Sequence, residues 1–164
     1  MKINDFLLRM WNDYSDLNPH INKVLDLIKE KESKTIINDH IALRTFNHKK
    51  INRHVLSSYF VKNGYKPIED LTFTEKKLKA TYYLHSDPTL PRIFISELLL
   101  ENFSEKLQKS INNKIDEIDV KSISDPEFLT SGIPWSPIDY KTYKEIQSES
   151  DYASWVLAMG YIAN

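Results

Sequence analysis

The chain has 164 residues, a formal net charge of −1 and 41% hydrophobic residues, which is the composition of one ordinary globular domain. A charge so close to neutral argues against a basic nucleic-acid binder and against an electrostatic membrane anchor. The sequence has no cysteine. Disulfides, cysteine-ligated zinc or iron–sulfur sites and thiol nucleophiles are therefore excluded within it.

Only three glycines occur, Gly64, Gly132 and Gly160, and they lie far apart. A phosphate-binding loop needs several glycines close together so that backbone amides can approach the anion. Rossmann and P-loop nucleotide sites are therefore excluded, and any chemistry must come from polar side chains or a bound metal. We see no targeting segment and no apolar stretch long enough to cross a bilayer, which indicates a cytoplasmic protein with neither nucleic-acid nor membrane partners.

Two amphipathic helices are predicted at the start of the chain. The first is carried by a stripe of apolar residues at helical spacing: Phe6, Leu7, Met10, Trp11 and Tyr14. The pair Asn18-Pro19 ends it, because a residue before proline disfavours the helical conformation. The second is expected over residues 20–32, with Ile21, Val24, Leu25 and Ile28 on one face. We expect both apolar faces to pack in the core.

The middle of the chain predicts a strand within residues 36–46, a helix over 51–63 ended by Gly64, and strands over 66–73, 78–85 and 92–100. Strand, helix and three strands in this order form the βαβββ module of the vicinal oxygen chelate architecture, in which two such modules enclose a metal. Many other α+β folds contain the same order.

Helices follow over residues 104–118, 140–146 and 151–159, with Ser148 or Ser150 as the cap of the last and Gly160 as its stop. Residues 161–163 resemble the start of another strand. The predicted fold class is α+β, with N-terminal helices over 1–35, the module over 36–101 and a helical segment over 102–164.

His40 and Arg44 are the leading candidates for a functional site. Alternation along a strand places them on one face with Ala42 and Phe46, while Ile41, Leu43 and Thr45 face the other way. Their Cα atoms would lie about 13 Å apart at the strand rise. That separation suits a metal at one end of a small dicarboxylate and a guanidinium at the other. Alternatively, His40 is a hydrogen-bonded strand histidine and Arg44 pairs with a surface carboxylate.

Glu97 lies inside an apolar run, where a lone carboxylate is costly unless it is paired or bound to a cation. It is therefore a candidate pocket residue, and the alternative is an edge strand on which it faces water. Non-haem iron sites commonly use two histidines and one carboxylate. No second histidine has a convincing spacing, so the residues alone give half a metal site.

Several segments together resemble the 2-oxoadipate dioxygenase/decarboxylase family, which is related to the vicinal oxygen chelate enzymes. The segments are NDHIALRTF at 38–46, KKLKA at 76–80, LPRIFISEL at 90–98, ESDYASW at 149–155 and GYIAN at 160–164. They occur in the family's order and span nearly the whole chain.

The resemblance implies a mononuclear Fe(II) site, with zinc as a metal that a crystal could contain instead. His40 would be a metal ligand, Arg44 would hold a substrate carboxylate, and Glu97 would lie in the pocket or behind a ligand. The implied reaction is oxidative decarboxylation and hydroxylation of a 2-oxo dicarboxylic acid such as 2-oxoadipate, with dioxygen as co-substrate.

In relatives the GYIAN segment continues into His-Phe-Thr, whose histidine is the second ligand, and a glutamate of a second module is the third. This chain ends at Asn164. The expectation is therefore an incomplete N-terminal half that is inactive alone, or a homodimer that supplies the missing module. Two other functions stay open: a zinc-dependent hydrolase on the same scaffold, and a non-catalytic binding or interaction module.

Overall fold

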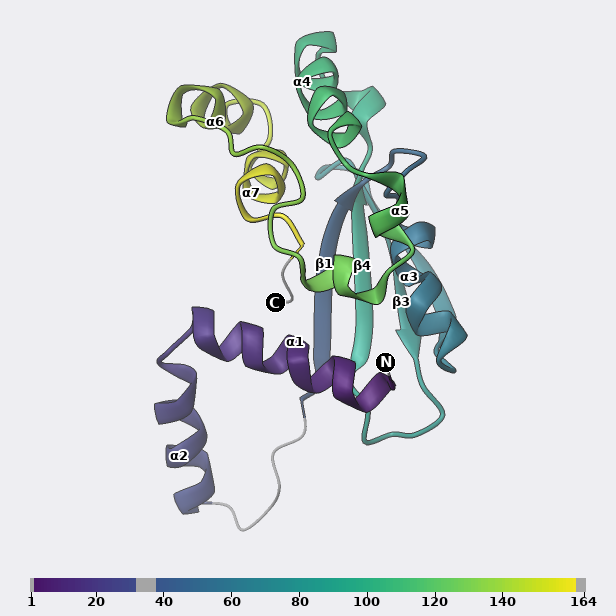
Figure 1. The fold of residues 1–164 in the computed structure, drawn as a ribbon, viewed down its shortest axis with the longest axis vertical. Helices are drawn as coiled ribbons and strands as arrows, with labels where there is room; N and C mark the ends of the chain where they lie inside the picture. Colours follow the sequence, from purple (N-terminus) through teal and green to yellow (C-terminus); the bar gives the residue numbers. More distant parts are fainter. Residues whose placement is uncertain (1, 32–37, 162–164) are drawn as a thin grey trace.

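A four-stranded mixed sheet forms the centre of the fold (Figure 1). The structure is a computed structural model and describes residues 2–31 and 38–161. The strands are β1 (His40–Phe46), β2 (Lys66–Phe73), β3 (Leu78–Leu84) and β4 (Arg92–Leu98). Their order in the sheet is β1-β4-β3-β2, with β1 parallel to β4 and the other pairs antiparallel. With α3 (Arg53–Lys62) between β1 and β2, this is the predicted βαβββ module.

Six further α-helices and two short 3-10 helices are described around this module. The α-helices are α1 (Ile3–Leu17), α2 (Ile21–Lys31), α4 (Glu105–Asp116), α5 (Val120–Ile123), α6 (Tyr140–Gln147) and α7 (Asp151–Met159), and the 3-10 helices are η1 (Leu100–Asn102) and η2 (Pro126–Thr130). The longer helices agree with the sequence prediction to within a few residues. The short elements α5, η1 and η2 were not predicted, because so few residues carry no clear periodicity. No helix among the described residues is long and apolar enough to cross a membrane.

The register of the strands divides the sheet into two faces. Leu43 pairs with Ile95 and Thr45 with Glu97, so these residues point to one face, which we call the core face. Arg44 pairs with Ser96 and Ala42 with Phe94, and these point to the other face, which we call the site face. Figure 1 shows α1, α3 and α5 in front of the sheet, over a single face.

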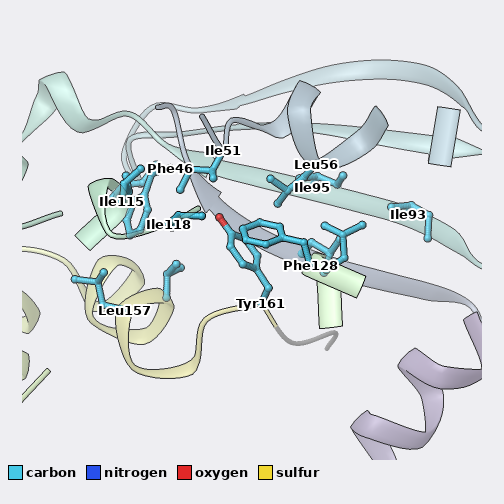
Figure 2. Packing of buried hydrophobic residues seen from close by; sticks show 14 of the residues in the cluster. Phe46, Ile51, Leu56, Ile93, Ile95, Ile115, Ile118, Phe128, Leu157 and Tyr161 are labelled. Carbon is cyan, nitrogen blue, oxygen red and sulfur yellow. The ribbon is translucent and has the colours of Figure 1, made fainter. Parts of the chain in front are cut away.

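The hydrophobic core lies between the core face and these helices. Leu43, Ile93 and Ile95 are fully buried there, and Phe6 of α1 packs edge-on against Phe60 of α3 with ring centres 5.9 Å apart. Figure 2 shows Phe128 and Tyr161 between the sheet and α7, and their ring centres lie 4.7 Å apart. Helices from both ends of the chain therefore share one core with the module.

The segment after α7 is fixed to the sheet by Tyr161. Its hydroxyl lies 3.0 Å from Thr45 Oγ1, and its backbone forms an isolated antiparallel bridge with Gly132. The extended start predicted after Gly160 is thus present at Tyr161, whereas residues 162–163 lie outside the described part of the chain. Ser150, and not Ser148, caps α7 by accepting a hydrogen bond from Ala153 N at 3.1 Å.

The prediction for α2 was wrong in one respect. The helix is present, but none of its residues is buried, and Val24, Leu27 and Ile28 are among the exposed large apolar residues. Periodicity identifies an amphipathic helix but does not say what covers its apolar face. By contrast, α1 buries Phe6, Leu7 and Met10 as expected. Residues 36–37 of the predicted first strand lie outside the described residues.

Candidate active site

Strand β1 presents His40 and Arg44 on the same side of the sheet, as the alternation predicted. Ile41, Leu43 and Thr45 are buried on the core face, whereas His40 is exposed and Ala42 and Arg44 are partly buried. Phe46, which was expected to share the face of His40 and Arg44, is fully buried in the hydrophobic core at the end of the strand.

His40 is held by the carboxylate next to it in sequence. Its Nδ1 lies 3.0 Å from Asp39 Oδ2, and Asp39 Oδ1 lies 3.5 Å from Arg92 Nη1 on the neighbouring strand. The hydrogen bond with His40, reinforced by the positive charge of Arg92, lowers the pKa of Asp39 below its ordinary value. When the ionised Asp39 accepts a hydrogen bond from Nδ1–H, Nε2 of the imidazole is the nitrogen with a free electron pair.

A hollow of about 280 Å³ opens beside His40. It is lined mostly by apolar and aromatic side chains of the first two helices and by residues at the start of β1: Met10, Trp11, Tyr14, Ile21, Asn38, His40 and Ile41. An apolar cavity with a few polar groups at one end is the usual form of a small-molecule site.

Arg44 lies against the C-terminal helix α7. Its Cζ is 4.6 Å from the ring centre of Trp155, within the range of a cation–π contact. One turn earlier in α7, the Tyr152 hydroxyl donates to Ser96 O at 2.8 Å and accepts from Thr45 N at 3.1 Å. Burial of this phenol raises the pKa of Tyr152 well above its ordinary value.

The structure does not bring Glu97 to this site. Glu97 points to the core face, is 4% exposed, and is paired with the Arg53 side chain at the start of α3. Its Oε2 also accepts from Arg53 N at 2.9 Å. The alternative of a water-facing edge strand is wrong as well, because β4 is an inner strand between β1 and β3. A carboxylate inside an apolar run must be paired or bound to a cation, and the buried ion pair with Arg53 meets this requirement for Glu97.

The described residues do not form a complete metal site. Over residues 2–31 and 38–161, no group of three or more His, Cys, Asp or Glu side chains lies close enough together to hold an ion. His40 can supply one nitrogen ligand, which is fewer than the three protein ligands of a typical non-haem iron site. His40 as a metal ligand therefore stays a prediction.

A family model described as 2-oxoadipate dioxygenase/decarboxylase matches residues 6–131. The chain belongs to this family. The match covers most of α1, all of α2 and the whole module, including residues 38–46 with His40 and Arg44.

The curated relatives in this family are longer than this chain. The curated 2-oxoadipate dioxygenase/decarboxylase of Oryza sativa subsp. japonica is 34% identical over 92% of the chain. The chain spans only 44% of that relative's length.

Solved structures agree with the fold. The Oryza sativa hydroxyglutarate synthase, crystallised with 2-oxoadipate, is 32% identical with a TM-score of 0.89, over 98% of this chain and 55% of that one. A Shewanella frigidimarina protein provisionally described as a hydrolase is 43% identical with a TM-score of 0.93, over 99% of this chain and 63% of that one. A glyoxalase superfamily protein from Ralstonia eutropha, 15% identical with a TM-score of 0.78 over 97% of this chain and 59% of that one, confirms the vicinal-oxygen-chelate-like fold.

Sequence reasoning missed three residues around the two leading candidates: Asp39, Tyr152 and Trp155. A signal was present for two of them, because Tyr152 and Trp155 are spaced i and i+3 on a short capped helix and so share one face. The pattern did not indicate that this face of α7 packs against β1, because that contact is long-range. Asp39 directly precedes His40, and its role depends on a side-chain rotamer that sequence does not specify.

Proposed function

We propose that this chain contributes to the iron-dependent oxidative decarboxylation and hydroxylation of a 2-oxo dicarboxylic acid of the size of 2-oxoadipate, with dioxygen as co-substrate. One observation carries the proposal: His40, which borders an apolar hollow, and Arg44 lie on the same side of β1 in a chain of the 2-oxoadipate dioxygenase/decarboxylase family. The chain spans 44% of the length of its curated rice relative, so the proposal concerns what this chain contributes and not the whole activity.

In this proposal Arg44 binds the carboxylate far from the metal. A guanidinium offers parallel N–H donors that match a carboxylate in a bidentate, charge-assisted pair. With the two Cα atoms about 13 Å apart along the strand, an extended six-carbon diacid reaches from a metal at His40 to Arg44. The same contact selects for a second carboxylate and sets the chain length.

His40 would supply one ligand to Fe(II) through Nε2, with Asp39 fixing the ring by its hydrogen bond to Nδ1. The other ligands would come from outside the described residues. When bound, the iron supplies a site that chelates the 2-oxo acid and activates dioxygen. The chain's own residues orient the two ends of the substrate, His40 at the metal end and Arg44 at the distal carboxylate.

The test compares two acids that differ only at the far end, 2-oxoadipate and 2-oxohexanoate. Nuclear magnetic resonance titrations of the protein with Fe(II) omitted and added would measure both affinities. We expect the dicarboxylate to bind more tightly, and Arg44→Gln to reduce that preference about tenfold, the size of a charge-assisted hydrogen bond. Equal affinity of the unaltered protein for both acids contradicts the proposal.

A zinc-dependent hydrolase is the second candidate, and it is favoured by the provisional description of the Shewanella frigidimarina structure. Metal content after purification, and oxygen uptake with 2-oxoadipate by the iron-loaded protein, separate the two. If His40→Ala and Arg44→Gln both leave ligand binding unchanged, the chain is instead a non-catalytic binding module.

A further inference from the structure

Helix α7 brings an aromatic ring to the guanidinium of Arg44. The Arg44 Cζ lies 4.6 Å from the centre of the Trp155 ring, and both residues are partly buried. The two residues are 111 positions apart in sequence, so the contact depends on how α7 packs against the edge strand β1. Arg44 itself is placed by β1, through its register with Ser96.

The position of Trp155 is set independently of Arg44. Tyr152, three residues earlier on the same face of α7, anchors the helix to the sheet through its hydroxyl contacts with Ser96 and Thr45. Val156 and Leu157 of the same helix are fully buried in the core. Ser150 caps the first turn. The ring of Trp155 is therefore part of a fixed surface against which the longer, more flexible arginine side chain rests.

Stacking has a specific consequence for carboxylate binding. The donors of a guanidinium lie in its plane, whereas an aromatic ring contacts a face of that plane. Contact of the Trp155 ring with the guanidinium restricts the rotamers that Arg44 can adopt. Ordering a free arginine side chain costs about 2 kcal/mol of rotamer entropy, and a preformed stack reduces the part lost on binding.

We infer that Trp155 is a positioning residue for the carboxylate-binding arginine: its ring holds the Arg44 guanidinium in the orientation that accepts the distal carboxylate of the substrate. The inference rests on the proposed function, because it assigns to Trp155 a share of the selectivity for dicarboxylates. It also makes α7, which follows the βαβββ module in the chain, part of the substrate site.

The experiment uses Trp155→Leu and Trp155→Phe in the full chain, with Tyr140→Leu as the control. Tyr140 is an exposed aromatic residue on α6, so its replacement removes a ring of similar size away from Arg44. The first measurement is the ¹H–¹⁵N resonance of the Arg44 Nε group. In the unaltered protein a ring current from Trp155 shifts it, and in Trp155→Leu we expect that shift to disappear.

The second measurement is the ratio of affinities for 2-oxoadipate and 2-oxohexanoate. We expect Trp155→Leu to lower this ratio about fivefold, which corresponds to about 1 kcal/mol at 1.4 kcal/mol for each factor of ten. Trp155→Phe should restore most of the ratio, because it keeps an aromatic face. Affinity for the monocarboxylate should change little in either variant, which a general loss of structure would not produce.

The outcomes separate the two proposals. If the unaltered protein prefers the dicarboxylate and Trp155→Leu keeps that preference, the role of Trp155 is overturned while the proposed function stands. If the unaltered protein binds 2-oxoadipate and 2-oxohexanoate with equal affinity, the proposed function fails and the inference fails with it. An Arg44 resonance that is the same in Trp155→Leu and in the unaltered protein also overturns the inference.

Discussion

Glu97 and Arg53 form a buried ion pair on the side of the sheet opposite to His40. The Arg53 side chain contacts Glu97 Oε1, its backbone N donates to Oε2 at 2.9 Å, and both side chains are close to fully buried. Arg53 Nε also donates to Thr81 Oγ1 at 2.9 Å. The pair thus joins the start of α3 to two strands, and its role is structural.

Removing one partner of this pair should destabilise the protein. We expect Glu97→Ala to lower the free energy of unfolding by about 3 kcal/mol, because it leaves the Arg53 charge buried and uncompensated. The double variant Arg53→Met with Glu97→Leu should lose much less, since apolar side chains of similar volume replace both charges. Denaturant unfolding measures both. If Glu97→Ala instead changes affinity for 2-oxoadipate at unaltered stability, Glu97 belongs to the site after all.

Glu97 also shows where sequence reasoning reached its limit. The rule that a lone carboxylate in an apolar run needs a partner was correct, but the partner, Arg53, comes from a helix 44 residues earlier, and no local pattern links the two. The shared face of His40 and Arg44 was predictable because both lie on one strand, where a period of two fixes the direction of each side chain. The exposed apolar face of α2 and the contact of Trp155 with Arg44 depend on tertiary packing, which periodicity does not encode.

Two glycines with similar positive φ angles provide a pair of substitutions to compare. Gly132 has φ +69° and Gly160 has φ +65°, and both values are unfavourable for other residues. A Cβ on Gly132 meets nothing within 4 Å, whereas a Cβ on Gly160 would lie 2.0 Å from Gly132 O. We expect Gly132→Ala to cost about 1 kcal/mol through backbone strain alone. Gly160→Ala should cost about 3 kcal/mol or more, because the backbone bridge between Gly132 and Tyr161 must also move.

Equilibrium unfolding in urea would compare the two variants. Equal losses of stability would contradict the close approach of the two segments.

Stability should fall at alkaline pH because of buried tyrosines. Burial raises the pKa of Tyr65 to about 12, and its hydroxyl donates to Pro91 O at 2.9 Å. An unfolded tyrosine ionises near pH 10, so between about pH 10 and 12 the unfolded chain loses this proton while the folded protein keeps it. The stabilisation is thus complete below pH 10 and is lost as pH rises towards 12, at up to about 1.4 kcal/mol per pH unit.

The variant Tyr65→Phe tests this assignment. At pH 8 it should be about 1 kcal/mol less stable, because the carbonyl of Pro91 loses its donor. Above pH 10 the difference from the unaltered protein should shrink, since phenylalanine has no proton to lose. Urea unfolding at several pH values between 8 and 11 gives both numbers. A difference that stays constant over this range would show that Tyr65 ionises alike in both states.

The last prediction concerns iron. Because no group of three metal-binding side chains occurs over the described residues, we expect the 164-residue chain alone to bind Fe(II) weakly and without saturation at micromolar metal. His40→Ala should abolish the remaining binding, and Asp39→Asn should weaken it about tenfold by releasing the ring that its carboxylate orients. Anaerobic calorimetry and metal analysis after gel filtration would measure both effects.

His54→Ala is the control for this experiment. His54 is an exposed histidine at the start of α3, and replacing it removes one imidazole without touching β1. It should leave Fe(II) binding as it is in the unaltered chain. Tight, stoichiometric binding that survives His40→Ala would place the metal elsewhere and contradict the assignment of His40. Tight binding that His40→Ala abolishes would support His40 as a ligand. It would also overturn the expectation of weak binding, because the metal would then have further ligands in this chain or in a second copy of it.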